Sequence, residues 1–210
     1  MSPPTIPSSA IPPADLVARY SVHDCDDVFY VPDFFDADQR LYDELESAIP
    51  WREETIGLFG RRVTVPRLTA WNGDDGVGYR YSRGDHRANG WLNELAGLRD
   101  HLRSRLGIRF NFVLANLYRH GQDAMGWHAD DEPELGECPC IASLSLGAAR
   151  RFCLRARDGS RRRTELLLES GSLLFMWGRS QHDWLHAVPR TRRPVGPRIN
   201  LTFRQVETTP

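Results

Sequence analysis

The sequence predicts an α+β fold that is mainly β, with helices near the N-terminus and a double-sheet β core in the C-terminal half. Before residue 110, apolar residues recur every three or four positions in two segments, which is the spacing of one helix face. After it, six short apolar segments alternate with loops rich in glycine, proline and charge, as in a sandwich or barrel. These segments are 110–118, 141–146, 151–156, 164–168, 172–177 and 198–206.

The chain divides into three parts by composition. Residues 1–27 begin with a run rich in proline and serine and are expected to be a disordered leader. Residues 28–109 form an N-terminal extension and 110–207 the β core. Because 210 residues are enough for one substantial hydrophobic core, we expect 28–207 to be one compact domain.

Two helices are expected in the extension. The first covers 36–49, with Asp36 as its N-cap and Pro50 after its end. The second covers about 89–106 and stops at Gly107, since glycine accepts the left-handed conformation that ends helices.

Strands are expected on either side of the first helix. A short one covers 28–31, and a β pattern runs from Thr55 to Thr69. Within that pattern the sequence Gly-Leu-Phe-Gly at 57–60 is typical of a hairpin tip. Trp71 follows in a stretch rich in glycine and aspartate that has no regular periodicity.

Charge is nearly balanced, at a formal net −1, so no overall basic field indicates nucleic acid. All 27 basic residues are arginines, which suit bidentate contacts to carboxylates and phosphates. Seven of them fall within 150–163. Such a run is usually a solvated face, and beside a nucleic-acid site it would be a phosphate track.

Four cysteines are too few and too irregularly spaced for a disulfide framework. Cys138 and Cys140 form C-x-C without a second pair, which argues against zinc. We interpret the cysteines as reduced thiols of an intracellular protein. No apolar run reaches the length of a membrane span.

The stretch from Asn116 to Glu132 contains the first candidate for chemistry. His128 and Asp130 lie two residues apart in a polar, glycine-rich loop. They could be two members of a 2-His-1-carboxylate triad for ferrous iron, although surface loops also produce this spacing by chance. His182 and His186 are both candidates for the third ligand, and the residues alone do not separate them.

The last expected strand carries the second candidate. Side chains alternate along a strand, so Arg198, Asn200, Thr202 and Arg204 share one face. That face could simply meet water. If it points into the core, two guanidiniums need two carboxylates, and a dicarboxylate such as 2-oxoglutarate offers both. Asn116 and Tyr118 share a face of segment 110–118 and point the same way.

The order N-x-Y, H-x-D, H and R-x-N-x-T-x-R resembles the AlkB family of iron(II)/2-oxoglutarate dioxygenases, from about Val28 to Val206. The segments HADDE, IASLSLGAARRF, ESGSLLFMWG and RINLTFR are similar to the branch that repairs alkylated DNA bases. The resemblance implies a double-stranded β-helix (jelly-roll) core and a β-rich nucleotide-recognition cap within 28–109.

The resemblance also implies roles for the candidate residues. Fe(II) would be held by His128, Asp130 and His186, the last chosen because LHAVP matches the family's hydrophobic-Pro step. Arg198 would bind the distal carboxylate of 2-oxoglutarate and Arg204 the carboxylate near the metal. The site would be completed by Asn116, Tyr118 and Asn200. The implied reaction uses O2 to demethylate N-alkylated bases oxidatively, releasing succinate, CO2 and formaldehyde.

Segments VPRLTAWNGD and GYRYS look like the family's nucleotide-recognition segment. They suggest Trp71, Tyr79 and Tyr81 as pocket walls for an extruded base, with Glu132 at the edge of the base. Without the resemblance, core packing is the better reading of these aromatic residues. Phe59 would be a wedge that enters the base stack of duplex DNA, or else a core residue. Further substrate contacts are expected from Arg61, Arg67, Arg155 and Arg157.

Two other functions fit part of the pattern. The same iron site could act on a protein or a small molecule, or the chain could be a non-catalytic nucleic-acid-binding module. The complete ligand set and both arginines argue against a pure binder. We expect an intracellular monomer without membrane contact, in cytoplasm or nucleoid if bacterial and in the nucleus if eukaryotic. DNA or RNA preference and the lesion stay open.

Overall fold

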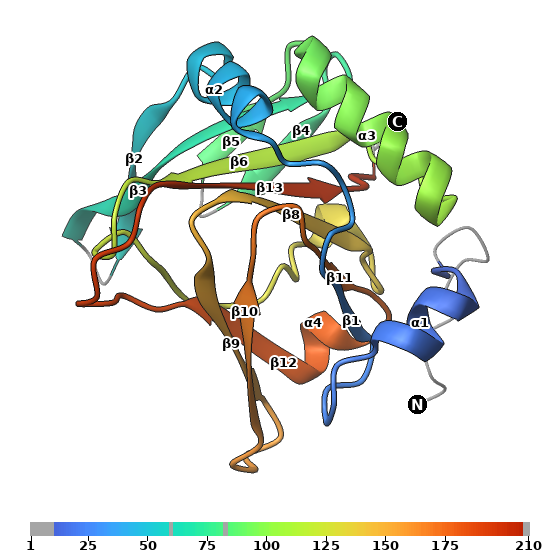
Figure 1. Cartoon of the computed structure of the whole chain (residues 1–210). Coiled ribbons are helices and arrows are strands. Elements are labelled where there is room, and N and C mark those ends of the chain that lie inside the picture. Colours follow the sequence, from blue (N-terminus) through green and yellow to red (C-terminus); the bar gives the residue numbers. More distant parts are fainter. Residues whose placement is uncertain (1–10, 59–60, 82–83, 208–210) are drawn as a thin grey trace.

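The computed structural model describes residues 11–58, 61–81 and 84–207, with side chains described outside 56–61 and 79–86. Two antiparallel sheets form the body (Figure 1). The large sheet has the order β1 (Val28–Val31), β11 (Leu173–Met176), β8 (Ile141–Gly147), β13 (Arg198–Arg204), β6 (Phe112–Tyr118), β3 (Arg61–Gly73) and β2 (Arg52–Leu58). The small sheet has the order β10 (Arg163–Leu168), β9 (Arg150–Ala156), β12 (Trp184–Val188) and β7 (Met125–His128).

The mainly β fold that the sequence predicts is confirmed. All six expected strands of the β core are present, with ends that differ by at most a few residues. The extension adds β2 and β3 to the same large sheet, paired as a hairpin in which Leu58 lies opposite Arg61. A separate two-stranded ribbon, β4 (Gly78–Tyr81) and β5 (Gly84–Arg87), follows β3. The expected boundary at residue 110 therefore runs through one continuous sheet.

Helices cover one face of the large sheet (Figure 1). They are α2 (Gln39–Ala48) and α3 (Asn93–Leu106), which contribute Leu45, Leu95 and Leu102 to the core. The cap of α2 is Asp38, whose side chain accepts from the Leu41 amide at 2.7 Å, and not Asp36 as the sequence suggested. The end of α3 at Gly107, which has φ of 72°, is confirmed.

The expectation of a disordered leader is wrong for its second half. Residues Ala14–Tyr20 form helix α1, because Leu16 is buried and Val17 packs against the core of the large sheet. Ser21 then bridges to Phe29 in β1. Residues 1–10 lie outside the described part of the chain.

Strands β6 and β13 are buried on both faces, and this property positions the site. Along each strand, successive side chains point in turn to opposite faces of the sheet, and both faces are buried. Ile199, Leu201 and Phe203 of β13 belong to the cluster that α2 and α3 cover. Arg198, Asn200, Thr202 and Arg204 face the opposite way, into the space between the two sheets. The polar face of the last strand therefore points inward, as the second reading of the sequence required.

Candidate metal and co-substrate site

Two histidines meet across the small sheet. His128 ends β7 and His186 lies in β12, and the strand register places them directly opposite each other. Their ring centroids are 4.1 Å apart. Asp130 follows two residues after His128, and one ligand atom from each of the three side chains lies within 4.8 Å of the others. Three donors of the 2-His-1-carboxylate type thus converge.

Sequence reasoning had placed His128 inside a polar loop, and this is wrong because His128 is the last residue of a strand. Four-residue β7 and five-residue β12 were both missed. The sequence MGWH lacks the apolar alternation that marks a strand. The chain enters β12 from the short helix α4 (Ser180–Asp183), so His182 and His186 belong to different elements.

Hydrogen bonding settles which nitrogen of His128 could hold a metal. Nδ1 of His128 lies 2.9 Å from the carbonyl oxygen of Gly126. Because a carbonyl can only accept, Nδ1 carries the hydrogen and donates it. Nε2 keeps its lone pair and lies 4.0 Å from Oδ1 of Asp130. Such outer hydrogen bonds are the usual way in which a metal-binding imidazole is oriented.

Electrostatics keep all three donors in the form that binds a cation. Burial lowers the pKa of His128, and burial together with the neighbouring His128 lowers the pKa of His186 to about 3. Both rings are therefore neutral at neutral pH. Burial alone would raise the pKa of Asp130, but Arg204 and then the two imidazoles outweigh it and lower that pKa to about 2. The site offers two neutral imidazoles and one carboxylate.

Asp130 gives a direct test of whether a metal fits. Its side chain is 1% exposed, and its Oδ2 accepts from Nη2 of Arg204 at 2.9 Å. Its Oδ1 has no hydrogen-bond partner among the described residues. A buried carboxylate oxygen without a partner is costly, and a cation between Asp130 and the two imidazoles would remove that cost. These residues fit Fe(II).

His182, the alternative ligand, lies elsewhere. It is exposed, and its Nε2 contacts the carbonyl oxygen of Glu137 at 2.6 Å. The structure therefore groups His186, and not His182, with His128 and Asp130.

The large sheet supplies the opposite wall of the same cavity. Its lining includes Leu114, Asn116 and Tyr118 of β6, Ser143 of β8, and Asn200, Thr202 and Arg204 of β13, together with the three candidate ligands. Nδ2 of Asn200 donates to Oγ of Ser143 at 2.8 Å and to the carbonyl of Leu144 at 3.0 Å. These bonds fix the amide against β8.

Arg198 is not part of this cavity lining, but it lies against Tyr118, which is. Its guanidinium carbon is 5.3 Å from the Tyr118 ring centroid, and its Nη2 donates to Oγ of Ser145 at 2.9 Å. Burial lowers the pKa of Arg198 to about 10, so it stays charged. Its Nε and Nη1 have no hydrogen-bond partner among the described residues. Two buried, unsatisfied donors on one guanidinium match a carboxylate, so the residues also fit 2-oxoglutarate.

Arg204 has a second role that the sequence did not suggest. Besides its bond to Asp130, its Nη1 donates to the carbonyl of Thr202 at 3.2 Å. The guanidinium joins the carboxylate of a candidate iron ligand to the last strand. Asn116 is likewise engaged, since its Oδ1 accepts from Nε of Arg67 at 2.7 Å. Arg67, expected at the substrate, is thus buried and braces the co-substrate wall.

The other expected substrate residues are spread over several places. Trp71 lies opposite Leu114 in the β3–β6 register, on the cavity side of the sheet, and its Nε1 donates to the carbonyl of Arg87 at 3.1 Å. Glu132 is half-buried at the start of the 3-10 helix Pro133–Leu135. Tyr79 and Tyr81 lie in β4 and Arg61 in β3, but their side chains, and all of Phe59, fall outside the described part.

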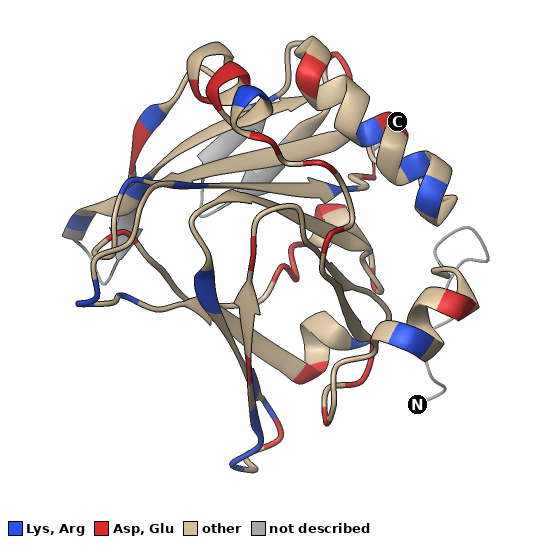
Figure 2. Ribbon diagram, viewed as in Figure 1, with Lys and Arg blue, Asp and Glu red and all other residues tan. Residues whose placement is uncertain are grey.

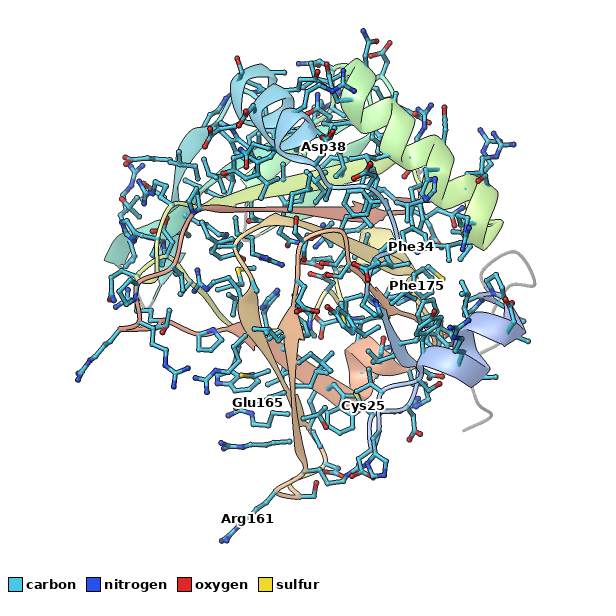
Figure 3. The ribbon with its side chains drawn as sticks, in the orientation of Figure 1. Cys25, Phe34, Asp38, Arg161, Glu165 and Phe175 are labelled. Atoms are coloured by element: carbon cyan, nitrogen blue, oxygen red, sulfur yellow. The ribbon has the colours of Figure 1, made fainter. Side chains whose placement is uncertain are left out.

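The arginine run 150–163 is not one continuous track. Arg150 is buried, and its Nη2 donates to the carbonyls of Asp123 and Pro189 at 2.8 and 2.9 Å, so this part of the expectation is wrong. Nη1 of Arg157 bonds Oδ2 of Asp131 and the carbonyl of Gln181, both at 3.0 Å, and braces the loop after Asp130. Arg151 lies near the start of β9 and forms an ion pair with Glu165 at 3.4 Å. Arg161 lies at the tip of the β9–β10 hairpin and points away from the body, and basic residues gather at that tip (Figures 2 and 3).

Sequence reasoning missed several supporting residues. Oε1 of Gln181 accepts from the Asp130 amide at 2.9 Å, and Phe152 stacks on His186 with centroids 5.4 Å apart. Ser143 and Ser145 alternate in ASLSLG, a signal that is readable once the pairing of β8 with β13 is known. Nothing in the local sequence marks Gln181.

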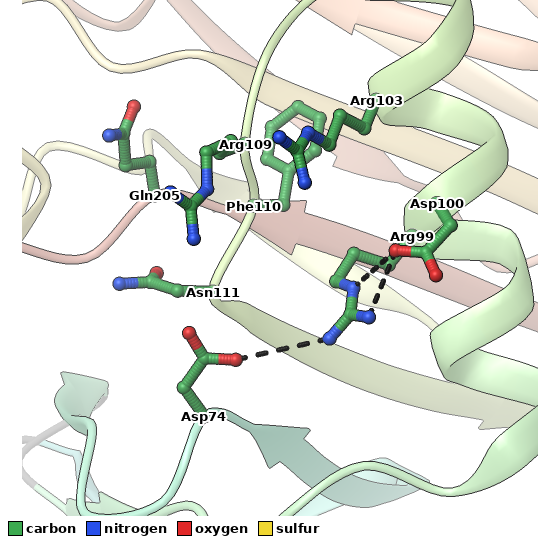
Figure 4. A pocket seen from close by; sticks show the side chains of 8 residues that line it. All are labelled: Asp74, Arg99, Asp100, Arg103, Arg109, Phe110, Asn111 and Gln205. Carbon is green, nitrogen blue, oxygen red and sulfur yellow. Dashed lines mark hydrogen bonds and ion pairs between the residues drawn. The ribbon is translucent and has the colours of Figure 1, made fainter.

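Another cavity, of about 330 Å³, lies against α3 and is built differently (Figure 4). Its described lining holds no histidine or cysteine. Arg99 lies within 2.9 Å of Asp100 and 3.9 Å of Asp74, so much of its charge is compensated. It is separate from the ligand cluster and lacks its donors.

A sequence model described as the 2OG-Fe(II) oxygenase superfamily matches residues 27–204. The alpha-ketoglutarate-dependent dioxygenase alkB homolog 3 of Bos taurus is 40% identical over 190 residues, covering 85% of this chain and 66% of the relative. The DNA oxidative demethylase ALKBH2 of Mus musculus is 38% identical over 180 residues, covering 81% of this chain and 75% of the relative. The solved structure of OsALKBH1 is similar in fold, with TM-score 0.58 and 18% identity over 85% of this chain and 98% of that one.

Fold, ligand cluster and these similarities place the chain in the 2OG-Fe(II) oxygenase superfamily. More specifically, the chain belongs to the AlkB family of these oxygenases. It spans 66% of the length of the alkB homolog 3 relatives from Bos taurus and Homo sapiens. Among the described residues, no helix is long and apolar enough to span a membrane.

Proposed function

We propose that this chain is an oxidative demethylase that repairs N-alkylated bases in DNA, with RNA as an alternative substrate. It would use Fe(II), O2 and 2-oxoglutarate and release succinate, CO2 and formaldehyde. The observation that carries the proposal is the shared cavity. His128, Asp130 and His186 line it, and polar side chains of β6 and β13 face them across it.

Bound iron would supply the oxygen chemistry that side chains cannot perform. The chain's own residues hold and orient the reactants. His128, Asp130 and His186 are the proposed ligands. Arg198 binds the distal carboxylate of 2-oxoglutarate with its two unsatisfied donors. Tyr118, Asn116 and Asn200 shape the space between, and the pairing of Arg204 with Asp130 keeps the carboxylate ligand ionised and in place.

Substrate recognition is proposed on the side of β3 and the β4–β5 ribbon. Trp71 shares the cavity side of β3, and Tyr79 and Tyr81 belong to β4. Flat side chains suit an extruded base, and a carboxylate such as Glu132 suits a cationic, alkylated one. Phe59 is the proposed wedge for duplex DNA, flanked by Arg61. Phe59→Ala should lose activity selectively on duplex, compared with a single strand that carries the same lesion.

The decisive experiment measures succinate release by the iron-loaded protein in the presence of different candidate substrates. We expect N-methylated oligonucleotides to stimulate release, whereas unmodified oligonucleotides and peptides do not. Stimulation by a peptide or small molecule alone would assign the iron site to another substrate. Absence of the charge-transfer absorption of an iron–2-oxoglutarate complex under anaerobic titration would favour a non-catalytic binding module.

We further propose an intracellular monomer. Four free cysteines, three of them buried, agree with a reducing compartment. Size-exclusion chromatography with light scattering tests the oligomeric state. A mass of two chains or more would contradict it.

A further inference from the structure

A second recognition element lies outside the metal cavity, on the rim of the small sheet. A groove of about 540 Å³ adjoins the cavity, and His128, Met125 and Val188 line both. Its walls come from β3 on one side and from β7, β9 and β12 on the other. The described lining includes Val63, Arg67, Trp127, His128, Cys153 and Arg190. The groove therefore reaches the side chain of a candidate iron ligand, His128.

Trp127 is the notable side chain of the groove. It directly precedes His128, yet it is 41% exposed, whereas Trp184 of the neighbouring strand is buried. An indole left open to solvent is a large apolar surface without an internal role. The guanidinium carbon of Arg155 lies 4.5 Å from its ring centroid, which holds the indole against the outer face of the sheet. Val63, another exposed apolar residue, lies in the same groove.

The charged residues in the described lining of the groove are positive, and the nearby carboxylate of Glu165 is paired with Arg151 at 3.4 Å. The described lining contains two arginines, Arg67 and Arg190, and no aspartate or glutamate. Beside it, Arg155 of β9 lies directly opposite Arg163 of β10 in the strand register. Two like charges in a directly opposed pair destabilise a sheet unless an anion lies between them. Neither arginine forms an ion pair within the part of the chain that the structure describes.

We propose that Trp127 is a stacking platform for a base of the single strand next to the target nucleotide. Arg155 and Arg163 hold the phosphate that follows it. An aromatic face beside arginines is how proteins bind single strands without reading sequence, because every base has a stackable face and every linkage a charge. The groove adjoins the cavity through His128, so a base on Trp127 and a base at the iron would belong to the same strand. This inference rests on the proposed function and adds where the strand continues.

The test compares Trp127→Leu with Trp127→Phe, which keeps an aromatic face. The probe is a short, fluorescently labelled single-stranded oligodeoxynucleotide with one N-methylated base, measured by anisotropy. We expect Trp127→Leu to weaken binding about tenfold and Trp127→Phe to stay within about threefold of the parent, as loss of one base stack implies. Leu167→Ala, an exposed apolar residue of the same sheet on β10, is the matched control and should bind like the parent.

A second arm uses a methylated mononucleotide, which has no neighbouring base to stack. The loss in kcat/KM for Trp127→Leu should be much larger on the oligonucleotide than on the mononucleotide. Equal losses on both would mean that Trp127 only supports His128 and would overturn the proposal. Unchanged oligonucleotide binding in Trp127→Leu would overturn it as well. The groove would then be a binding site for a protein segment instead of nucleic acid.

The phosphate part is tested by salt dependence. Arg155→Gln and Arg163→Gln should each reduce the slope of log binding constant against log salt by about one, the signature of one lost phosphate contact. Unchanged slopes in both variants would remove the arginines from the proposal. Binding of an unmodified oligonucleotide can be measured without turnover. A parent protein that binds it through Trp127 but is not stimulated by any methylated base would contradict the proposed function and leave this inference standing.

Discussion

The two sheets of this molecule differ in how many of their faces are covered. In the large sheet, every residue of β6 and β13 is buried, because helices cover one side and the small sheet the other. In the small sheet, β10 alternates between exposed and covered side chains, and β7 is partly open throughout. The large sheet carries the proposed co-substrate residues, and the small sheet carries both histidines.

This difference separates two tasks. A doubly covered strand can bury charges such as Arg198 and Arg204 deeply, where a guanidinium binds a carboxylate strongly. A singly covered sheet keeps one face open, so that a large substrate can reach the residues at its edge. The reaction would take place between them, with the small ligand held on the covered side and the polymer on the open side.

The sharpest test of this division removes the ligands of the small sheet. We expect His128→Ala, Asp130→Ala and His186→Ala to abolish turnover and iron binding, because three ligands are the minimum of such a triad. His182→Ala should behave like the parent, since His182 is exposed and its ring contacts the carbonyl oxygen of Glu137, away from the ligand cluster. Iron binding is followed by the absorption of the anaerobic 2-oxoglutarate complex. Loss in His182→Ala with retention in His186→Ala would reverse the assignment.

On the large sheet the two arginines should fail in different ways. Arg198→Ala should raise the 2-oxoglutarate concentration needed for half-maximal turnover by tens- to thousands-fold, since breaking a buried charge pair costs roughly 2–5 kcal/mol. Arg204→Ala should weaken iron binding as well, because it leaves the buried Asp130 carboxylate without its cationic partner. Titrations with metal and with co-substrate separate the two effects. If Arg204→Ala bound iron as tightly as both Arg198→Ala and the parent, the Arg204–Asp130 pair would be dispensable for metal binding.

Stability should follow the same contrast. Leu201→Ala, in the doubly covered β13, should lower the free energy of unfolding by about 2–5 kcal/mol through the cavity it creates. Leu167→Ala, 55% exposed on β10, should change it by less than about 0.5 kcal/mol. Urea denaturation measures both. Similar losses of unfolding free energy in the two variants would mean that Leu167 is more enclosed than its 55% exposure indicates.

The smallest expected effect concerns thiol chemistry. Burial raises the pKa of Cys25 and Cys140 to about 12, so their reactive thiolates are scarce at mildly alkaline pH. Cys138 is only half-buried and should be alkylated first by iodoacetamide. Peptide mass spectrometry over time gives the order. Early labelling of Cys140 would show that β8 opens readily at its start.

Much of this arrangement could be predicted from the sequence, for reasons that particular residues show. The alternation in RINLTFR predicted which residues share the polar face, because side chains of any strand alternate with a period of two. That this face points inward followed only from the structure. The strand at 28–31 was also found. The strands that carry both histidines were not, because MGWH and WLHAV are held by pairing with distant partners rather than by local pattern.

Similarly, burial of Arg150 could not be predicted from an arginine-rich run. Three backbone carbonyls from 120, 123 and 189, brought together only by the fold, turn a surface residue into an internal support. Trp127 directly precedes the predicted ligand His128 in the sequence. Its exposure could not be predicted, because it depends on which face of β7 points to solvent.

Strand β7 has a further property that follows from its place. It is an edge strand, paired only with β12 in the described sheets, and the register between them is interrupted by an irregularity between His186 and Val188. Edge strands with few ladder bonds open locally before the rest of a domain unfolds. A metal held by His128 and His186 would be a cross-link between the two strands. Amide hydrogen exchange at β7 should therefore slow on metal loading far more than exchange at β13, and this segment would act as a reporter of metal occupancy.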